Sequence, residues 1–152
     1  MNTYAYVGNN PLSFVDPTGL ASIQEITAQI LAVGPYDAYV ARNIAMNSLA
    51  TAQHSGLPGL HNGQGDAFRH CIWSCDLANS LGVDQAKKVG DLHERYGKGP
   101  EAEQCMDLKN NEEGRGAAGA GNCSTSCMGL LGGGALQTTP GGTMPSNVYS
   151  PY

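Results

Sequence analysis

Polar side chains of the kinds that enzymes use for hydrolysis are concentrated between residues 65 and 115. Several recur at intervals of three or four residues, so that on a helix they would share one face. The candidate residues are Asp66, Arg69, His70, His93, Glu94, Asp107, Asn111 and Arg115. An imidazole or a carboxylate can activate water, and a guanidinium can hold developing anionic charge. The sequence therefore predicts one hydrolytic site.

Two catalytic schemes fit these residues. In the first, His70, His93 and Asp107 hold a divalent metal ion that lowers the pKa of a bound water, and Glu94 is the base. In the second, no metal takes part, and His70 or His93 is the base while Asp66 orients it. The order of these residues resembles that of HD-type helical metallohydrolases, from which it departs in having Glu94 in place of aspartate.

Each residue taken alone also has a purely structural interpretation. Asp66 and Arg69 could form a helix-surface ion pair worth only about 0.2–0.5 kcal/mol, and Asn111 could mark a helix end. On one helix, His93 and Glu94 diverge by roughly 100°, so they cannot face one centre equally well. The concentration of the whole set within about fifty residues favours a site.

Residues that begin and end helices divide the chain into five or six short segments. Ser22 opens a capping box, and Gly34-Pro35 and Gly82 are helix breakers. Asp84 and Asn122 can each cap a following helix. The expected helices cover about residues 22–33, 36–53, 66–81, 84–96, 100–115 and 122–131. No strand pattern follows residue 20, so the fold class is predicted to be all-α, a compact helical bundle.

The first and last segments differ in character. Ile23, Ile26, Ile30 and Leu31 form an apolar stripe with helical periodicity at the start. From Thr138 onward the chain is rich in glycine and proline and is predicted to be an irregular tail.

Four of the five cysteines are paired at helical spacing. Cys71 and Cys75 are four residues apart, as are Cys123 and Cys127, so each pair shares one face of a helix. If the two helices are antiparallel, two disulfides could link these faces, and Cys105 would remain unpaired. The C-x₃-C spacing differs from the C-x₂-C of zinc ribbons, so we rank disulfides above a metal. The alternative is a set of small, buried thiols in a reducing compartment.

Composition fits a single domain of 152 residues with a net charge of −5. The acidic balance argues against long-range steering toward nucleic acid, although several basic residues gather between positions 69 and 98. No apolar run reaches the roughly 18 residues needed to span a membrane, and no secretory signal pattern is apparent. Export would therefore require a larger carrier.

The first twenty residues carry a specific resemblance. Tyr4-Ala5-Tyr6-Val7-Gly8-Asn9-Asn10-Pro11 followed by Asp16-Pro17-Thr18-Gly19-Leu20 resembles the last repeat of Rhs/YD-repeat proteins. In that family the repeats form a large β-shell, and the variable polypeptide after this motif is a toxin, released by cleavage near it. The resemblance implies that residues 1–20 are a short extended remnant of the Rhs core. Residues 21–137 would then be the helical toxin domain, and 138–152 its tail.

The pattern from Asp66 to Cys75, with His93-Glu94 and the segment from Met106 to Arg115, also looks like a recurrent toxin domain found after Rhs cores. The resemblance implies a carrier shell with its secretion machinery, a cognate immunity protein and a target-cell macromolecule as substrate. Delivery into a competing bacterium is expected, to the periplasm rather than the cytoplasm, since disulfides persist there.

We expect an antibacterial hydrolase of the cell envelope, acting on peptidoglycan or lipid, with a divalent metal ion as the possible cofactor. A cytosolic nuclease of DNA or RNA is the alternative. A membrane-inserting pore former is the third hypothesis, supported only by the short apolar run at residues 128–136.

Overall fold

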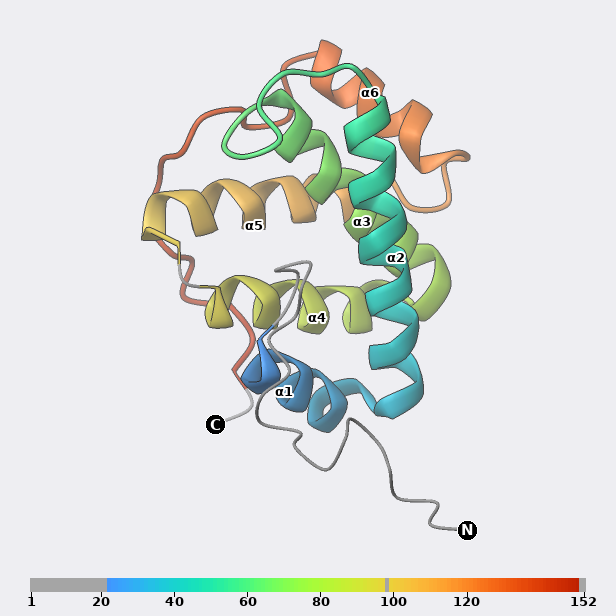
Figure 1. The fold of residues 1–152 in the computed structure, drawn as a ribbon, viewed down its shortest axis with the longest axis vertical. Coiled ribbons are helices and arrows are strands. Elements are labelled where there is room, and N and C mark those ends of the chain that lie inside the picture. The colour runs from blue at the N-terminus through green and yellow to red at the C-terminus, as the bar shows by residue number, and fades with distance from the viewer. Residues whose placement is uncertain (1–21, 98, 151–152) are drawn as a thin grey trace, which may run out of the picture.

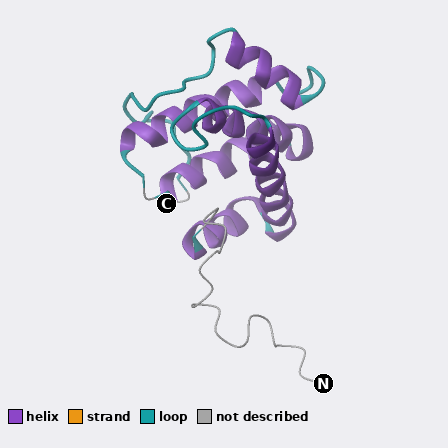
Figure 2. Cartoon of the chain, turned by 45° about the horizontal axis from the view of Figure 1, so that its top comes forward, coloured by secondary structure: helices purple, strands orange, loops and turns teal. Residues whose placement is uncertain are grey.

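The computed structural model describes residues 22–150 except residue 98, and this part of the chain folds into six helices without a strand (Figure 1, Figure 2). The predicted all-α fold is therefore confirmed for the described residues, while the predicted remnant at residues 1–20 lies outside them. The helices are α1 (Ile23–Val33), α2 (Pro35–His54), α3 (Gln64–Leu81), α4 (Val83–Tyr96), α5 (Glu101–Gly116) and α6 (Cys123–Gly132).

Most helix ends follow from the local signals in the sequence. The Ser22 hydroxyl accepts a hydrogen bond from the Glu25 backbone N–H at 3.1 Å, and the Asn122 side chain caps α6 through Thr125. Gly34 and Gly82 both have φ of 88°, a conformation that suits glycine at a junction between helices. The predicted cap at Asp84 is wrong, because Gly82 occupies that position and no side chain caps α4.

Helix α3 is the centre of the fold. It packs against α2, α4, α5 and α6, and twelve of its 18 residues are buried. Helices α4 and α5 run side by side across it, α1 lies against α4, and α6 lies at the opposite end of the molecule (Figure 1). One apolar core surrounds Phe68 and Ile72 next to α6, and a second surrounds Trp73, Leu77 and Val89 next to α4. Because α3 packs against four helices, residues on different sides of α3 face different helices.

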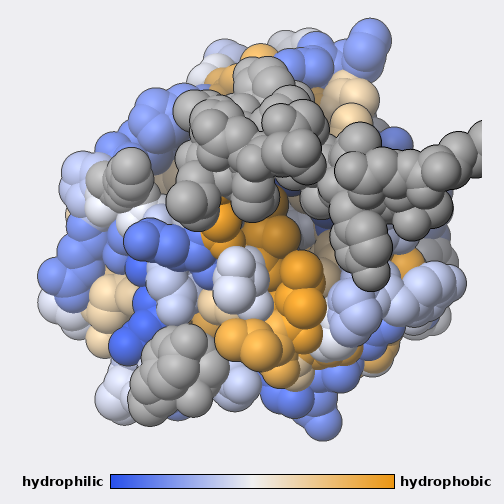
Figure 3. Space-filling view, turned by 60° about the horizontal axis from the view of Figure 1, so that its bottom comes forward, coloured by the Kyte–Doolittle hydropathy of each residue, from blue (hydrophilic) through white to orange (hydrophobic). Residues whose placement is uncertain are grey.

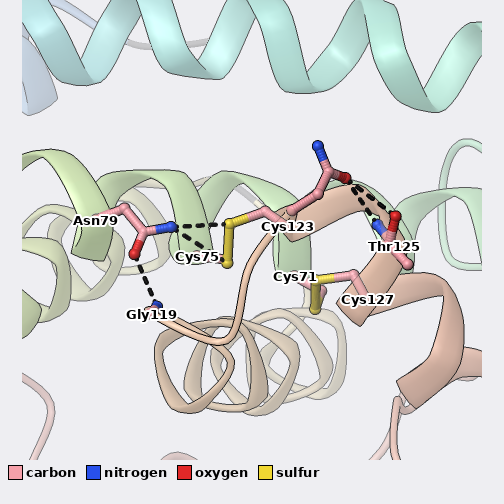
Figure 4. The surroundings of a disulfide bond; sticks show 8 residues. Cys71, Cys75, Asn79, Gly119, Cys123, Thr125 and Cys127 are labelled. Carbon is pink, nitrogen blue, oxygen red and sulfur yellow. Dashed lines mark hydrogen bonds between the residues drawn. A yellow bond between two sulfur atoms is a disulfide. The ribbon is translucent and has the colours of Figure 1, made fainter.

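The predicted disulfides are confirmed. Cys71 bonds to Cys127 and Cys75 to Cys123, which joins α3 to α6 at two successive turns (Figure 4). Asn79 donates to the Cys123 sulfur at 3.2 Å and accepts from the Gly119 backbone N–H at 2.9 Å, so the loop before α6 is held as well. The remaining cysteine, Cys105, is a buried free thiol.

A glycine sets the close packing of α3 on α5. A Cβ atom placed on Gly114 would lie 2.2 Å from the backbone oxygen of Cys71, a distance at which atoms overlap. The two helix backbones therefore touch at this point. The contact lies one residue after His70 on α3 and one turn after Asn110 and Asn111 on α5.

The C-terminal segment contains no helix or strand between residues 134 and 150, in agreement with the irregular tail predicted from Thr138 onward, yet it is attached to the bundle. Asn110 donates to the Gln137 carbonyl and accepts from the Gln137 backbone N–H, both at 2.8 Å. Further on, the Tyr149 backbone N–H donates to Asp91 at 2.7 Å. The segment thus runs as a strap past α5 and α4 toward α1 (Figure 1).

Helix α1 packs with its polar side inward. Its buried residues are Glu25, Ala28 and Gln29. The predicted apolar stripe does form a helix, but Ile30 is 40% exposed and Leu31 is 69% exposed. Apolar side chains gather on the face of the molecule where α1 lies (Figure 3). In the described part of the chain, no helix combines the length and apolarity that a membrane crossing requires.

Candidate functional site

Helices α3, α4 and α5 bring five of the predicted residues into one buried cluster around His70. On one side of the imidazole, Nε2 lies 3.7 Å from Asp66 Oδ1 and 3.4 Å from Asp107 Oδ1. On the other side, Nδ1 lies 3.3 Å from Asn111 Oδ1 and 3.6 Å from Glu94 Oε1. Asp66 and His70 share a face of α3 because they are one turn apart, and Asp107 and Asn111 do so on α5.

Arg69 fixes the proton position on His70. Its Nη2 atom lies 2.6 Å from His70 Nε2, and a guanidinium can only donate, so Nε2 carries the lone pair. The proton is then on Nδ1, where it faces the Asn111 carbonyl oxygen. Burial, together with the charges of Arg69 and His93, holds the pKa of His70 well below its usual value. His70 is therefore neutral, and its Nε2 atom accepts from Arg69 while lying within 3.7 Å of two aspartate oxygens.

Asp66 accepts three hydrogen bonds from neighbouring groups. Arg69 donates to Oδ1 from both Nη2, at 2.6 Å, and Nε, at 3.1 Å. Asn62, which has a φ of 57°, donates its backbone N–H to Oδ2 at 2.7 Å. This aspartate is thus held rigidly beside His70, and the loop before α3 contributes to the site through Asn62, a contact that the sequence did not suggest.

Asp107 is the incompletely satisfied member of the cluster. Its Oδ1 atom is buried, and the described residues offer it no hydrogen-bond partner. Burial and the charges of Glu94 and Asp66 raise the pKa of Asp107 to about 8. Burial also raises the pKa of Glu94, to about 7, against the opposing effect of His93 and Arg69. These carboxyl groups lie where a proton or a cation would relieve the repulsion between them.

The geometry suits a metal ion. One oxygen each from Asp66 and Asp107 and one nitrogen of His70 lie within 4.8 Å of one another. Ligand atoms about 2.1 Å from a tetrahedral ion are about 3.4 Å apart, close to the 3.4 and 3.7 Å separations from His70 Nε2. This trio differs from the predicted ligand set of His70, His93 and Asp107 in that Asp66 replaces His93.

His93 instead points toward α1. Its Nδ1 atom lies 2.8 Å from Glu25 Oε1, and its ring packs edge-on against Trp73, with 5.1 Å between centroids. The ring centroid is 6.1 Å from that of His70, so the two histidines are neighbours, but among the described residues His93 does not join the group of possible ligand atoms formed by Asp66, His70 and Asp107. Burial alone would lower the pKa of His93, but the hydrogen bond to Glu25 and the charges of Glu94 and Glu25 raise it to about 9.

Arg115 lies apart from the His70 cluster. It lines a separate cavity of about 230 Å³ between α4, α5 and the C-terminal strap, together with Lys87 and Asp91. Of the eight candidate residues, seven thus lie in or next to one centre, and Arg115 borders another cavity. The sequence missed Glu25 because its position three residues after Ser22 is also that of the acid in a capping box.

No solved structure matches this chain. A family model described as Domain of unknown function (DUF6973) matches residues 28–127. The matched segment contains all of the His70 cluster and both disulfides, and it begins just after Glu25. Because the match covers more than half of the chain, this protein belongs to the DUF6973 family.

Proposed function

We propose that this chain is an Rhs-type antibacterial toxin effector whose helical domain hydrolyses a component of a competitor's cell envelope, peptidoglycan or lipid. The observation that carries the enzymatic part is the buried group of His70, Asp66 and Asp107, with its unpartnered carboxylate oxygen 3.4 Å from a deprotonated imidazole nitrogen. Such a group is costly to bury and contributes little to a core, whereas it can activate water.

A divalent metal ion fits the same group. Asp66, His70 and Asp107 would hold it, and the ion would lower the pKa of a bound water toward neutrality. The Arg69 guanidinium, whose side chain is 20% exposed, would have to turn away from both His70 Nε2 and Asp66 Oδ1. Glu94 and Asn111 would then support the ligand from the Nδ1 side, as outer carboxylates and amides do for metal-bound histidines. In this proposal Glu94 orients His70, a role different from that of the base expected from the sequence.

The two disulfides favour delivery to an oxidising compartment, the periplasm, over action in the cytoplasm. The carrier shell, its secretion machinery and the cognate immunity protein are part of this proposal and rest on the sequence resemblance at residues 1–20.

A cytosolic nuclease is the second candidate, and Arg69 is the observation that favours it. A guanidinium next to His70 and Asp66 could hold the charge that develops on a phosphodiester. The predicted basic stretch supports it less, because Lys87 forms an ion pair with Asp91 and Lys88 lies over the Tyr149 ring.

The test is expression of the full chain in bacteria with and without a periplasmic signal sequence, counting survivors and scoring lysis and DNA integrity. Asp107→Asn should abolish killing. The matched control is Asp91→Asn, because Asp91 is also buried but lies outside the cluster, and it should leave killing intact. Killing with lysis only from the periplasm supports the envelope hydrolase. Loss of nucleic acid after cytosolic expression alone would favour the nuclease. Undiminished killing by Asp107→Asn would refute the site.

The metal is tested separately on purified protein. Zn²⁺, Mn²⁺ or Mg²⁺ added after chelation should raise the melting temperature of the wild type, since an ion that binds only the folded state stabilises it by about 2.7 kcal/mol at one hundred times its dissociation constant. Asp107→Asn should show no such shift. Killing activity that survives in a variant unable to bind any of these ions would exclude the metal-dependent scheme and favour the metal-free acid–base scheme.

A further inference from the structure

Helix α1 buries a carboxylate where an amphipathic helix would normally bury apolar side chains. Glu25 is 3% exposed, although Leu31 on the same helix is 69% exposed. Its Oε1 atom receives two hydrogen bonds, from Gln29 Nε2 at 2.9 Å and from His93 Nδ1 at 2.8 Å. Removing a charged group from water is unfavourable unless the group is paired. The orientation of α1 therefore places one specific acid against one specific imidazole.

We infer that Glu25 is a positioning residue of the proposed active site, acting through His93; this inference rests on the proposed function. By engaging Nδ1, the carboxylate fixes the plane of the ring and reserves Nε2 as the nitrogen available to substrate. Trp73 limits the ring from another side, through an edge-on contact with centroids 5.1 Å apart. A carboxylate that holds one nitrogen of a histidine and leaves the other for proton transfer is a recurrent way to prepare an acid–base catalyst.

His93 is well placed for this role. Its ring centroid is 6.1 Å from that of His70, so the two rings lie next to each other in the bundle. Its side chain is 21% exposed, whereas that of His70 is 1% exposed, so His93 is the histidine of the pair that substrate can reach. His70 is thus the buried histidine, surrounded by carboxylates. His93 is the more accessible one, and Glu25 holds it through a hydrogen bond.

The experiment compares full-length variants in the periplasmic killing assay. Glu25→Gln keeps an acceptor but removes the charge, and Glu25→Ala removes both. We expect killing to fall by at least roughly 10- to 100-fold, the usual effect of losing a carboxylate that orients a metal-bound histidine. Ser22→Ala is the matched control, because it weakens the cap of the same helix without touching the carboxylate. It should lower the melting temperature and leave killing unchanged.

A spectroscopic readout separates positioning from mere packing. In histidine-labelled protein, the His93 Nδ1 proton should give a strongly hydrogen-bonded NMR signal that disappears in Glu25→Ala. If Glu25→Gln and Glu25→Ala kill like the wild type while His93→Gln does not, the inference is overturned. Undiminished killing by His93→Gln, or equal losses in Ser22→Ala and Glu25→Gln, would also overturn it. A wild type harmless in both compartments would refute the proposed function itself, and the NMR signal would then mark a structural pair only.

Discussion

The stability lost on removing one disulfide should depend on whether the other disulfide is still present, because the two bonds close nested loops. The Cys71–Cys127 bond spans 56 residues and the Cys75–Cys123 bond spans 48. In the chain-entropy relation, closing a loop of either length destabilises the unfolded chain by about 4 kcal/mol. Once one bond is present, the other closes only the four-residue intervals on α3 and on α6. That ring of about eight residues contributes about 2.5 kcal/mol.

The expected free energies of unfolding follow directly. Replacing Cys71 and Cys127 by alanine, or Cys75 and Cys123, should each lower the stability of the oxidised protein by about 2.5 kcal/mol. Replacing all four should lower it by about 6.5 kcal/mol, which exceeds the sum of the two separate losses. Whole domains typically have stabilities of about 5–15 kcal/mol, so the fourfold variant should lose a large part of its stability.

Urea unfolding followed by far-ultraviolet circular dichroism measures these differences. Wild-type protein treated with a reducing agent should behave like the fourfold variant, which controls for the lost sulfur atoms. If removal of a single bond costs as much as removal of both, the two loops are not nested in the unfolded state as the structure implies. A strictly additive result would refute the entropic argument in the same way.

Two further predictions concern packing and pH. Gly114→Ala should destabilise the protein by about 1–3 kcal/mol or more, because the new methyl group would overlap the Cys71 carbonyl. Gly116→Ala has open space at its Cβ and should be neutral or stabilising by up to about 1 kcal/mol, so equal urea midpoints for the two variants would contradict the packing argument. In chelated protein, the raised pKa values of Glu94, about 7, and Asp107, about 8, mean that the folded state holds protons which the unfolded state releases. Their stabilising contribution is complete below pH 4 and is lost as the pH rises through 7 and 8. Asp107→Asn should therefore gain stability relative to the wild type over this interval, and urea midpoints measured from pH 4 to 9 that show no such gain would contradict it.

The sequence predicted those features whose causes are local. A helix cap such as Ser22 or Asn122 acts on backbone groups within three residues, and both caps form as expected. The four-residue spacing of the cysteines is likewise a property of a single helix turn, which is why the cross-linked pair of helices could be inferred. Asp84 failed as a cap because a glycine two residues earlier already ends one helix and begins the next.

Features that depend on how helices pack could not be read from the sequence. The four-residue spacing on α3 suggested that Asp66 and His70 act together. The sequence could not show that Asp66, in place of the predicted His93, groups with His70 and Asp107, or that His93 faces α1. The periodicity of α1 favoured an inward apolar stripe, yet the helix packs with Glu25 inward because His93 on α4 supplies a partner for the acid. Arg115 shares a face with Asn111 on α5 but reaches beyond it into the cavity under the strap.

The contact between Gly114 and the backbone of α3 has a consequence for comparing members of this family. Because glycine has no side chain, this contact allows the closest approach of the two helix backbones. It thereby sets the distance between the turn of α3 that carries His70 and the turn of α5 that carries Asp107. A relative with any larger residue at the aligned position must hold these helices farther apart or at another angle. Its acidic side chain could then no longer reach the imidazole as Asp107 does here. The residue at this single position thus indicates whether a relative's sequence can assemble the same centre.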